Sequence, residues 1–536
     1  MDTSLKCLTI SVLLALTLVV IPAQGQVERA SIIGNVTDKT GAVLAGVVVT
    51  VTHEETNTAI KVTTSDTGAF TAVNLIPGSY TISARHPGFA PVTYRNFVVQ
   101  VSQQARVNFV MELGALEQSV EVTDAAPLLQ TENSSVGQVI GSAALNQLPL
   151  NGRNFVQLAV LAPGVTGLDY SQPNTINSGQ RPDELRPGGT TLTANGASNY
   201  SNQVLLDGID DTEMISHTFV VRPSVEGIQE FKVLTNNPGA EYGRAAGAIA
   251  VLTTKSGSNQ MHGSVFEFLR NDKLDALGFF ANRSLAKPPY KLNQYGGSIG
   301  GPVILPHYSG KDRTFFFADY EGFREVAGAP QVLTVPTAAM RAGNFAGVVP
   351  NGIYDPLTTR PNPAGGANIR DRFPGDVIPQ NRFQAIGAAL VNLYPMPQTS
   401  ALVNNYVTTL VKRSNIHRAD GRLDHQLSSK GTLFLRYSVD WADIRMPETF
   451  NTDIGGNEAS FAGTDAVHGH SLVAAYTRSF SATTIGDFRY GLTKFHGGLV
   501  PNVLTNPVWK TIPGRLDSDP YQPSAPIVSP SGYAGL

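Results

Sequence analysis

Four acidic residues lie close together in one short segment, at Asp207, Asp210, Asp211 and Glu213. Several carboxylate oxygens within a short loop are the ligands that hard cations such as Ca²⁺ prefer. The spacing does not match a calcium-binding loop, and Asp207-Gly208 is a common turn dipeptide. The segment therefore predicts a turn after a buried strand, with cation binding as the alternative.

Catalytic motifs are mostly absent from the sequence. It contains neither a zinc-binding His-Glu-x-x-His nor a phosphate-binding loop that ends in Gly-Lys-Ser/Thr. Residues 296–300 match the letters of a nucleophile elbow, but Gly301-Pro302 follows where that motif must open a helix. His468 and His470 could face one side of a strand, yet no third metal ligand lies near them. We therefore predict that the protein is not an enzyme and has no cofactor or metal site.

The composition excludes further classes of protein. A chain of 536 residues exceeds a single hydrophobic core, so several domains are expected. Charged residues make up only 15%, and no run after the N-terminus approaches the roughly 20 apolar residues of a membrane helix. The net charge of -3 provides no basic field for a phosphate backbone. We therefore expect no nucleic acid as a partner.

The N-terminus has the pattern of an export signal. Lys6 supplies positive charge, Leu8 to Ile21 form an almost unbroken apolar stretch, and Ala23 and Gly25 are the small residues of a cleavage site. We predict a signal peptide over residues 1–25; a retained membrane anchor, which would need roughly 20 apolar residues, is the alternative. Cys7, the only cysteine, would be removed with it, so the mature chain would have no disulfide.

Short strand signals separated by turn residues run from Ala30 to about Gly114. Their spacing of roughly 8 to 12 residues is typical of a β-sandwich, and Asp66-Thr67-Gly68 and Pro77-Gly78 are turn sequences. The expected strands are residues 31–37, 47–52, 59–64, 69–73, 79–84, 92–101 and 106–113. We predict a seven-stranded β-sandwich over residues 30–114.

The motifs of this segment resemble the carboxypeptidase-regulatory-like domain. They are Gly34-Asn35-Val36-Thr37-Asp38, Gly41-Ala42, Ala45-Gly46-Val47, Thr67-Gly68-Ala69-Phe70 and Leu75-Ile76-Pro77-Gly78-Ser79-Tyr80. The resemblance implies a carbohydrate-binding-like sandwich fold and does not by itself imply an activity.

Residues 115–133 have a looser pattern, which indicates a linker. Part of this linker could pair as an added strand, because its main-chain groups would be available along an edge. The residues that could form this strand are Leu116, Gln118, Ser119, Val120, Glu121 and Val122. An ordinary interdomain linker is the alternative.

Residues 134–254 predict a mixed α/β region. Short helices are expected at residues 143–148 and 154–161, each followed closely by a proline. Strands are expected at residues 202–206, 228–235 and 248–254. The region resembles the plug domain of TonB-dependent receptors, in an ordered series of matching blocks. These blocks are Leu148-Pro149-Leu150-Asn151-Gly152-Arg153, Leu205-Leu206-Asp207-Gly208-Ile209, Val225-Glu226-Gly227-Ile228-Gln229-Glu230-Phe231 and Glu241-Tyr242-Gly243-Arg244.

Residues 255–536 carry strand signals, at 265–269, 314–320, 433–438 and 485–492, separated by long polar loops. This pattern is typical of a transmembrane β-barrel. The segment has room for about seven to eleven strands, whereas plugged transporters have about 22. We therefore predict an incomplete transmembrane antiparallel β-barrel, as expected of a truncated chain.

Motifs at the start of this segment resemble the Oar-like branch of the TonB-dependent receptors. They are Gln294-Tyr295-Gly296-Gly297-Ser298-Ile299-Gly300-Gly301-Pro302 and Phe315-Phe316-Phe317-Ala318-Asp319-Tyr320-Glu321-Gly322, whereas Thr254-Lys255-Ser256-Gly257-Ser258-Asn259 is similar to the entry into the barrel of these receptors. The resemblance implies a mainly β protein of the outer membrane, in contact with its lipid, with plug and sandwich toward the periplasm. It also implies that an unknown extracellular ligand is imported by energised plug movement.

The same resemblance implies a TonB-like energy-transducing partner, which would pair with the strand near Leu116 to Val122. Arg153, Arg222 and Arg244 are then candidates to latch the plug, because they could pair with acidic residues of the barrel wall. Arginines that contact only water are the alternative. A second hypothesis for the whole protein is an exported adhesin or carbohydrate-binding protein that uses the N-terminal sandwich.

Overall fold

The computed structural model describes residues 30–114, 120–122, 134–167, 192–214, 217, 219–240, 242–279, 286–450, 463–481 and 484–501. The predicted signal peptide lies outside these residues. The fold is mainly β, as the sequence predicts, and its sheets follow one another along the chain. No helix among the described residues combines the length and the apolar character needed to cross a membrane.

The N-terminal region, residues 30–114, consists of two sheets that enclose one hydrophobic core. The first sheet contains β1 (Ala30–Asp38), β4 (Ala69–Leu75), β7 (Gln104–Arg106) and β8 (Phe109–Met111). The second has the order β3 (Ala59–Thr63), β2 (Val48–His53), β5 (Gly78–Arg85), β6 (Val92–Val99) and β9 (Val120–Val122). Alternate residues of both sheets, such as Ile32, Phe70 and Ile82, point inward and are buried.

Eight of these strands lie in residues 30–114, and β9 lies in the following linker; the eight are one more than the sequence predicts, because the expected strand 106–113 is divided between β7, which ends at Arg106, and β8. Its two parts, β7 and β8, both pair with β1 in the same register, as Ile33 with Arg106 and Val36 with Phe109. Between them the side chain of Asn108 accepts a hydrogen bond from the amide of Asn35 at 3.0 Å. A side-chain oxygen thus replaces the main-chain partner and interrupts the ladder locally.

The middle region, residues 134–254, contains a five-stranded sheet. Its order is β10 (Val136–Gly141), β15 (Ile228–Asn236), β16 (Ile249–Thr254), β13 (Gln203–Leu206) and β14 (Ile209–Asp210). Helix α2 (Ser142–Gln147) and the 3-10 helix η3 (Phe155–Leu161) contribute Leu145 and Phe155 to a core on one face of this sheet. Strands β11 (Val165–Gly167) and β12 (Leu192–Ala194) form a separate pair.

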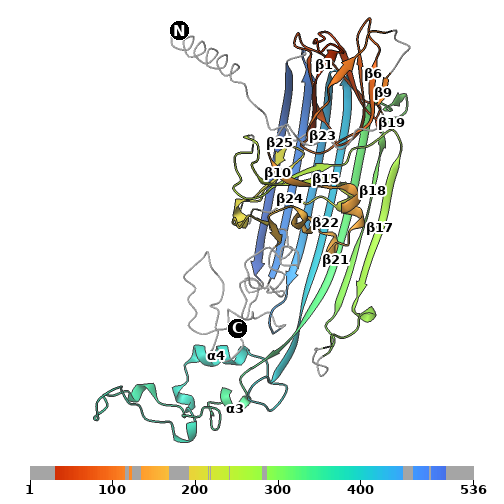
Figure 1. Ribbon diagram of the computed structural model, residues 1–536. Coiled ribbons are helices and arrows are strands. Elements are labelled where there is room, and N and C mark those ends of the chain that lie inside the picture. The colour runs from red at the N-terminus through yellow and green to blue at the C-terminus, as the bar shows by residue number, and fades with distance from the viewer. Residues whose placement is uncertain are drawn as a thin grey trace, which may run out of the picture.

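A long antiparallel sheet follows, and its seven strands are neighbours in chain order. They are β17 (His262–Asn271), β18 (Tyr290–Pro302), β21 (Thr314–Leu333), β22 (Tyr406–Ser428), β23 (Gly431–Met446), β24 (Gly463–Ser479) and β25 (Ile485–Pro501). Within the described part of the chain, β17 and β25 each have one neighbour, so the sheet is not closed. The middle region lies across the long strands, and the N-terminal region lies at one end of them (Figure 1).

The two ends of the long sheet differ in their connections. At the end beside the N-terminal region, short connections join β18 to β21 and β22 to β23, and the first of these holds the small hairpin β19 (Ile304–Leu305) and β20 (Tyr308–Ser309). At the opposite end, the long connection from β21 to β22 carries α3 (Ala338–Arg341) and α4 (Ala385–Leu393) (Figure 1). Short turns at one end and long loops at the other are the pattern of outer-membrane barrels.

Buried and exposed side chains alternate along most of β22 and β23. Those on the inner face of β22 and β23, toward the middle region, are buried, and many are charged. Those on the outer face include Leu435, Tyr437 and Tyr490, which are 43%, 48% and 63% exposed. Such an exposed apolar band is what strands facing lipid require.

Candidate functional site

The contact between the middle region and the long sheet contains a carboxylate bound by two arginines. Asp207 follows β13 with φ 48, and the adjoining Gly208 has φ 88, so the predicted turn is present. The Asp207 side chain is fully buried; its Oδ1 lies 3.4 Å from Nη1 of Arg422, and its Oδ2 lies 3.0 Å from Nε of Arg436. Arg422 belongs to β22 and Arg436 to β23, so this acid joins the middle region to two strands.

Other groups hold these charges in place. Thr254 donates its amide and hydroxyl to Asp207 at 3.1 and 2.7 Å. Arg422 also pairs with Asp424 at 2.8 Å, and Arg436 donates to the Ser438 hydroxyl at 2.6 Å. Burial raises the pKa of the Asp207 carboxyl, but Arg422, Arg436 and Thr254 outweigh it and hold the pKa below its usual value. Asp207 is therefore ionised at neutral pH.

Arg153 makes a second ionic link. Its guanidinium pairs with Glu226 of the middle region and lies 3.5 Å from Glu321 of β21. Glu321 also binds Arg418 of β22 at 3.0 Å, which extends the network along the sheet. The Arg153 guanidinium also stacks over the Phe266 ring, 4.4 Å from its centroid.

The other two arginines predicted as latch candidates are placed differently. The backbone amide of Arg222 donates to Asp440 of β23 at 3.4 Å. Arg244 pairs with Asp210 at 2.5 Å, and this pair lies within the middle region and is about half exposed. The structure thus brings the side chain of Arg153 and the backbone of Arg222 to the long sheet, whereas Arg244 instead links two segments of its own region.

The acidic group around Asp207 does not converge on one point. Asp210 pairs with Arg244, whereas buried Asp211 accepts the amide of Val221 at 3.2 Å. Burial raises the pKa of Asp211 well above its usual value. Across the part of the chain that the structure describes, no group of three or more His, Cys, Asp or Glu residues has metal-binding geometry.

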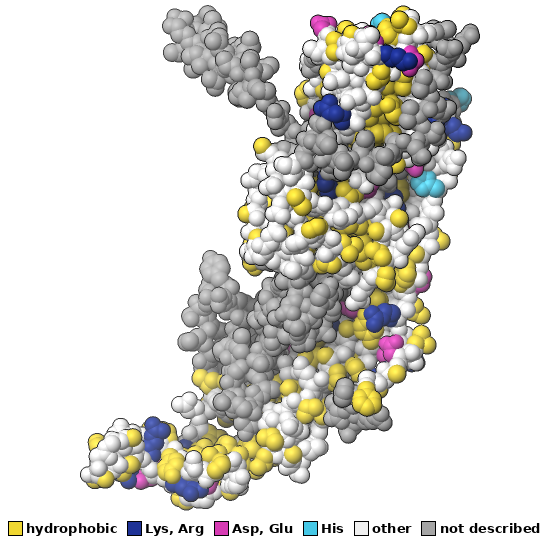
Figure 2. Space-filling view, viewed as in Figure 1, with side chains coloured by type: hydrophobic (Ala, Val, Ile, Leu, Met, Phe, Trp, Pro, Cys, Tyr) yellow, Lys and Arg dark blue, Asp and Glu magenta, His cyan; other side chains and the backbone are white. Residues whose placement is uncertain are grey.

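The ionic contact also contains carboxylate oxygens without a protein donor. Within the described ranges, one buried oxygen each of Glu226, Asp319, Glu321 and Asp420 has no hydrogen-bond partner. Buried polar atoms of this kind are usually satisfied by water. The contact is therefore a polar surface suited to hydration. On the face of the middle region that is visible in Figure 2, charged side chains are sparse.

The segment predicted to pair with a partner is partly described. Val120–Val122 forms β9, which lies parallel to β6, with Val120 opposite Val92 and Val122 opposite Tyr94. Leu116, Gln118 and Ser119 lie outside the described residues. Among the described residues, Val120, Glu121 and Val122 form an edge strand that pairs with the chain's own N-terminal sheet. A parallel pairing of three residues provides few main-chain hydrogen bonds.

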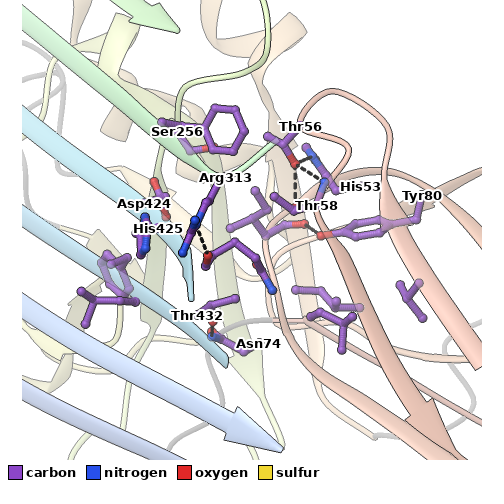
Figure 3. Close-up of a pocket in the computed structure, with 18 residues that line it drawn as sticks. His53, Thr56, Thr58, Asn74, Tyr80, Ser256, Arg313, Asp424, His425 and Thr432 are labelled. Atoms are coloured by element: carbon purple, nitrogen blue, oxygen red, sulfur yellow. Dashed lines mark hydrogen bonds between the residues drawn. The ribbon is translucent and has the colours of Figure 1, made fainter. Parts of the chain in front are cut away.

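The N-terminal region contacts the short-turn end of the long sheet around a small cavity (Figure 3). His53 and Thr56 face Arg313, Asp424 and His425 across it. Its volume of 70 Å³ suits about two water molecules. Beside it, the Asn74 amide donates to Thr432 and Thr477 at 3.1 and 2.6 Å, which fixes the N-terminal region on β23 and β24.

A turn of the N-terminal region also inserts into the middle region. Val101 is fully buried in an apolar cluster with Leu205 and Ile249. Glu230 accepts the Val101 amide at 2.6 Å, and Lys232 donates to the Ser102 carbonyl at 3.2 Å. Burial raises the pKa of Glu230 to about 7, against the lowering effect of the Val101 amide and Lys232.

Comparisons with known proteins give two family matches. The family described as "Outer membrane beta barrel domain" matches residues 253–536, and the "Carboxypeptidase regulatory-like domain" matches residues 31–112. A curated relative, the TonB-dependent transporter Oar of Myxococcus xanthus, is 24% identical over 310 residues, which is 55% of this chain and 26% of that protein. The chain thus spans about a quarter of the length of the curated relative it matches.

Solved structures with similarity include the siderophore receptor PirA from Acinetobacter baumannii, at 16% identity and a TM-score of 0.38, covering 68% of this chain and 40% of that one. Another is the outer membrane transporter YddB from Escherichia coli, at 12% identity and a TM-score of 0.38, covering 64% of this chain and 37% of that one.

Asp207→Asn should destabilise the contact strongly, because it leaves Arg422 and Arg436 buried without their shared anion. We expect a loss of about 3–5 kcal/mol, measured by thermal unfolding of the folded chain. Asp210→Asn, which removes an exposed pair in the same turn, should cost about 1 kcal/mol or less. Equal losses in the two variants would contradict the role given to Asp207.

Glu230 should make the attachment of the N-terminal region depend on pH. The free carboxyl loses its proton near its ordinary pKa of 4.5, whereas in the folded chain it keeps the proton up to about pH 7. Stability should therefore be greatest below pH 4.5 and fall as the pH rises toward 7, by on the order of 1–3 kcal/mol.

Thermal unfolding at pH 4.5 and pH 7.5 measures this dependence. Glu230→Gln should reduce it, since the amide keeps the acceptor for Val101 and does not titrate, while Asp211, whose pKa burial also raises, still titrates. Glu112→Gln, at an exposed pair with Lys39, is the matched control and should keep it. If Glu230→Gln keeps the full pH dependence, another group is responsible.

Proposed function

The chain belongs to the outer membrane beta barrel family, and from this we propose that it is part of a TonB-dependent receptor that binds an extracellular ligand and imports it. Its location is the outer membrane, and its resemblance to the Oar-like receptors is confirmed by the curated relative. The curated relative is a transporter, which supports a role in transport instead of catalysis.

The observation that carries the proposal is the buried ionic contact. In our account the long sheet is the first part of a barrel wall, and the middle region is the plug held against its inner face. Two sets of ion pairs hold the plug in one position: Asp207 with Arg422 and Arg436, and Arg153 with Glu321. Buried ion pairs favour one register of the plug against the sheet. Removing one member of such a pair leaves the other member buried with an uncompensated charge.

The polar character of this contact also favours movement of the plug away from the sheet. Separating two apolar surfaces would expose their full area to water at roughly 25 cal/mol per Å². Separating charged surfaces lets water solvate both sides, which offsets much of the lost attraction. We infer that the plug is held specifically and can still be displaced by a mechanical pull.

The pull would act on the linker at residues 115–133. In this proposal a TonB-like protein pairs with the segment Leu116 to Val122 by strand addition, and β9 is then exchanged from β6 to the partner. The domain limits predicted from the sequence form part of this proposal. The alternative, an adhesin that binds carbohydrate through residues 30–114, stays a prediction.

Replacing residues 116–122 by a Gly/Ser segment of equal length should weaken binding of the full chain to the periplasmic domain of the host's TonB-like protein. Because the main-chain and side-chain contacts of a strand are lost, we expect at least about a tenfold rise in Kd by calorimetry, equivalent to roughly 1.4 kcal/mol. The same replacement at residues 124–130 keeps the tether and should leave Kd unchanged. Unaltered affinity in the first variant would refute the coupling role.

A further inference from the structure

The turn that joins β6 to β7 is held in shape by the N-terminal region itself. The Gln103 side chain accepts a hydrogen bond from the Gln100 amide at 2.8 Å, and the Gln103 amide donates to the Gln100 carbonyl at 3.2 Å. Ser31 of β1 donates its amide to the Gln103 carbonyl at 2.9 Å. Val101, which lies within this turn, is therefore carried as a fixed part of the N-terminal sandwich.

Val101 covers one face of the sheet in the middle region. Residues of β16 alternate between two clusters: Leu252 belongs to the core shared with the helices, and Val251 belongs to the cluster that contains Val101. Val101 is fully buried there, and the other buried members of its cluster belong to the middle region. This contact is apolar, so water cannot replace it when the two regions separate.

The same N-terminal sandwich is attached to the short-turn end of the long sheet. Asn74 of β4 donates to the hydroxyls of Thr432 on β23 and Thr477 on β24. At the edge of the second sheet, the Lys61 amide of β3 donates to the Ser429 carbonyl, in the turn between β22 and β23, at 3.3 Å. Figure 3 shows Asn74 beside Thr432 where the two sets of strands meet. The sandwich thus has one attachment to the middle region and another to the long sheet.

Three contacts therefore join three regions in a closed set. Asp207 joins the middle region to the long sheet, Val101 joins the sandwich to the middle region, and Asn74 joins the sandwich to the long sheet. The middle region cannot leave the long sheet while both contacts of the sandwich persist. Water can solvate the separated ion pairs, but it cannot replace the burial of Val101. The sandwich therefore supplies the attachment that most resists displacement.

We propose that the N-terminal sandwich is a brace that fastens the plug to the barrel wall, and that it must release the contact at Val101 or the contact at Asn74 before the plug moves. Strand β9 pairs with β6, and the last residue of β6, Val99, leads directly into the turn that carries Val101. A pull on the linker therefore reaches this turn through one strand. The inference rests on the proposed function, in which the middle region is the plug, and it gives the sandwich a mechanical role.

Thiol labelling at the contact between plug and wall tests the brace. Ser224 is 2% exposed and its hydroxyl donates to Asp319 of β21 at 2.5 Å, so the thiol of Ser224→Cys should react only when the plug leaves the wall. Cys7, the only native cysteine, is replaced by serine, and the full chain is folded in detergent micelles. Val101→Ser should raise the labelling rate by at least about tenfold, because it removes apolar burial from the contact.

Asn74→Ala is the more decisive variant. The hydrogen bonds of Asn74 are with the wall, so an effect on position 224 has to pass through the sandwich. We expect the labelling rate to rise by at least about fivefold, since two hydrogen bonds are lost. The matched control is Val98→Ser, the same substitution at a side chain of β6 that is 60% exposed, and it should leave the labelling rate unchanged.

If Val101→Ser prevents folding, Val101→Thr keeps the shape of the side chain and places one hydroxyl in the apolar cluster, and it should also accelerate labelling. Unchanged labelling in the folded Val101 variant or in Asn74→Ala, or an equal acceleration by Val98→Ser, would overturn the brace. The experiment contains no TonB-like protein. Its failure would leave the proposed coupling at residues 116–122 intact, and failure of that coupling would leave the brace intact.

Discussion

The structure depends on one buried electrostatic constraint, the shared carboxylate of Asp207 between Arg422 and Arg436. A buried arginine needs an anion, and the carboxylate that Arg422 and Arg436 share comes from a separate region of the chain, although Arg422 also pairs with Asp424 of its own strand. The long sheet therefore requires a partner on its inner face, and the middle region supplies the group that fits. The remaining contacts, from Arg153 to Asp440, extend this ionic attachment along β21, β22 and β23.

The two faces of the long sheet are consequently opposite in character. Arg436 and Ser438 on β23 point inward, and Leu435 and Tyr437 between them point outward, since side chains alternate along a strand. A polar inner face and an apolar outer face suit a strand with lipid on one side and a hydrated interior on the other. The alternation that places charged groups on the inner face therefore also produces the apolar surface of the outer face.

Local pattern predicted much of this fold. The N-terminal strands were recognisable because their buried residues alternate and turns such as Pro77-Gly78 separate them. The division of the last strand was not, because the Asn108 side chain can replace a main-chain acceptor only once β1 lies beside it. Arg153 lies 3.5 Å from Glu321 of the sheet, whereas Arg244 pairs with the nearer Asp210, and the spacing of these residues in the sequence does not distinguish the two cases. The Asp207 pairing could not be foreseen from spacing, since Arg422 is 215 residues away and no local signal links the two.

The position of the middle region against the inner face of the sheet is the claim on which the account rests. Crosslinking in intact outer membranes tests it most directly, with cysteines placed at Ser224 and Asp319, whose Oγ and Oδ1 atoms lie 2.5 Å apart. Asp319 points inward and its neighbour Tyr320 points outward, so Tyr320 provides a control on the same strand. The account predicts that a short thiol crosslinker joins position 224 to position 319 and leaves position 320 unlinked. Equal crosslinking yields at positions 319 and 320, or no crosslink at position 319, would contradict the account.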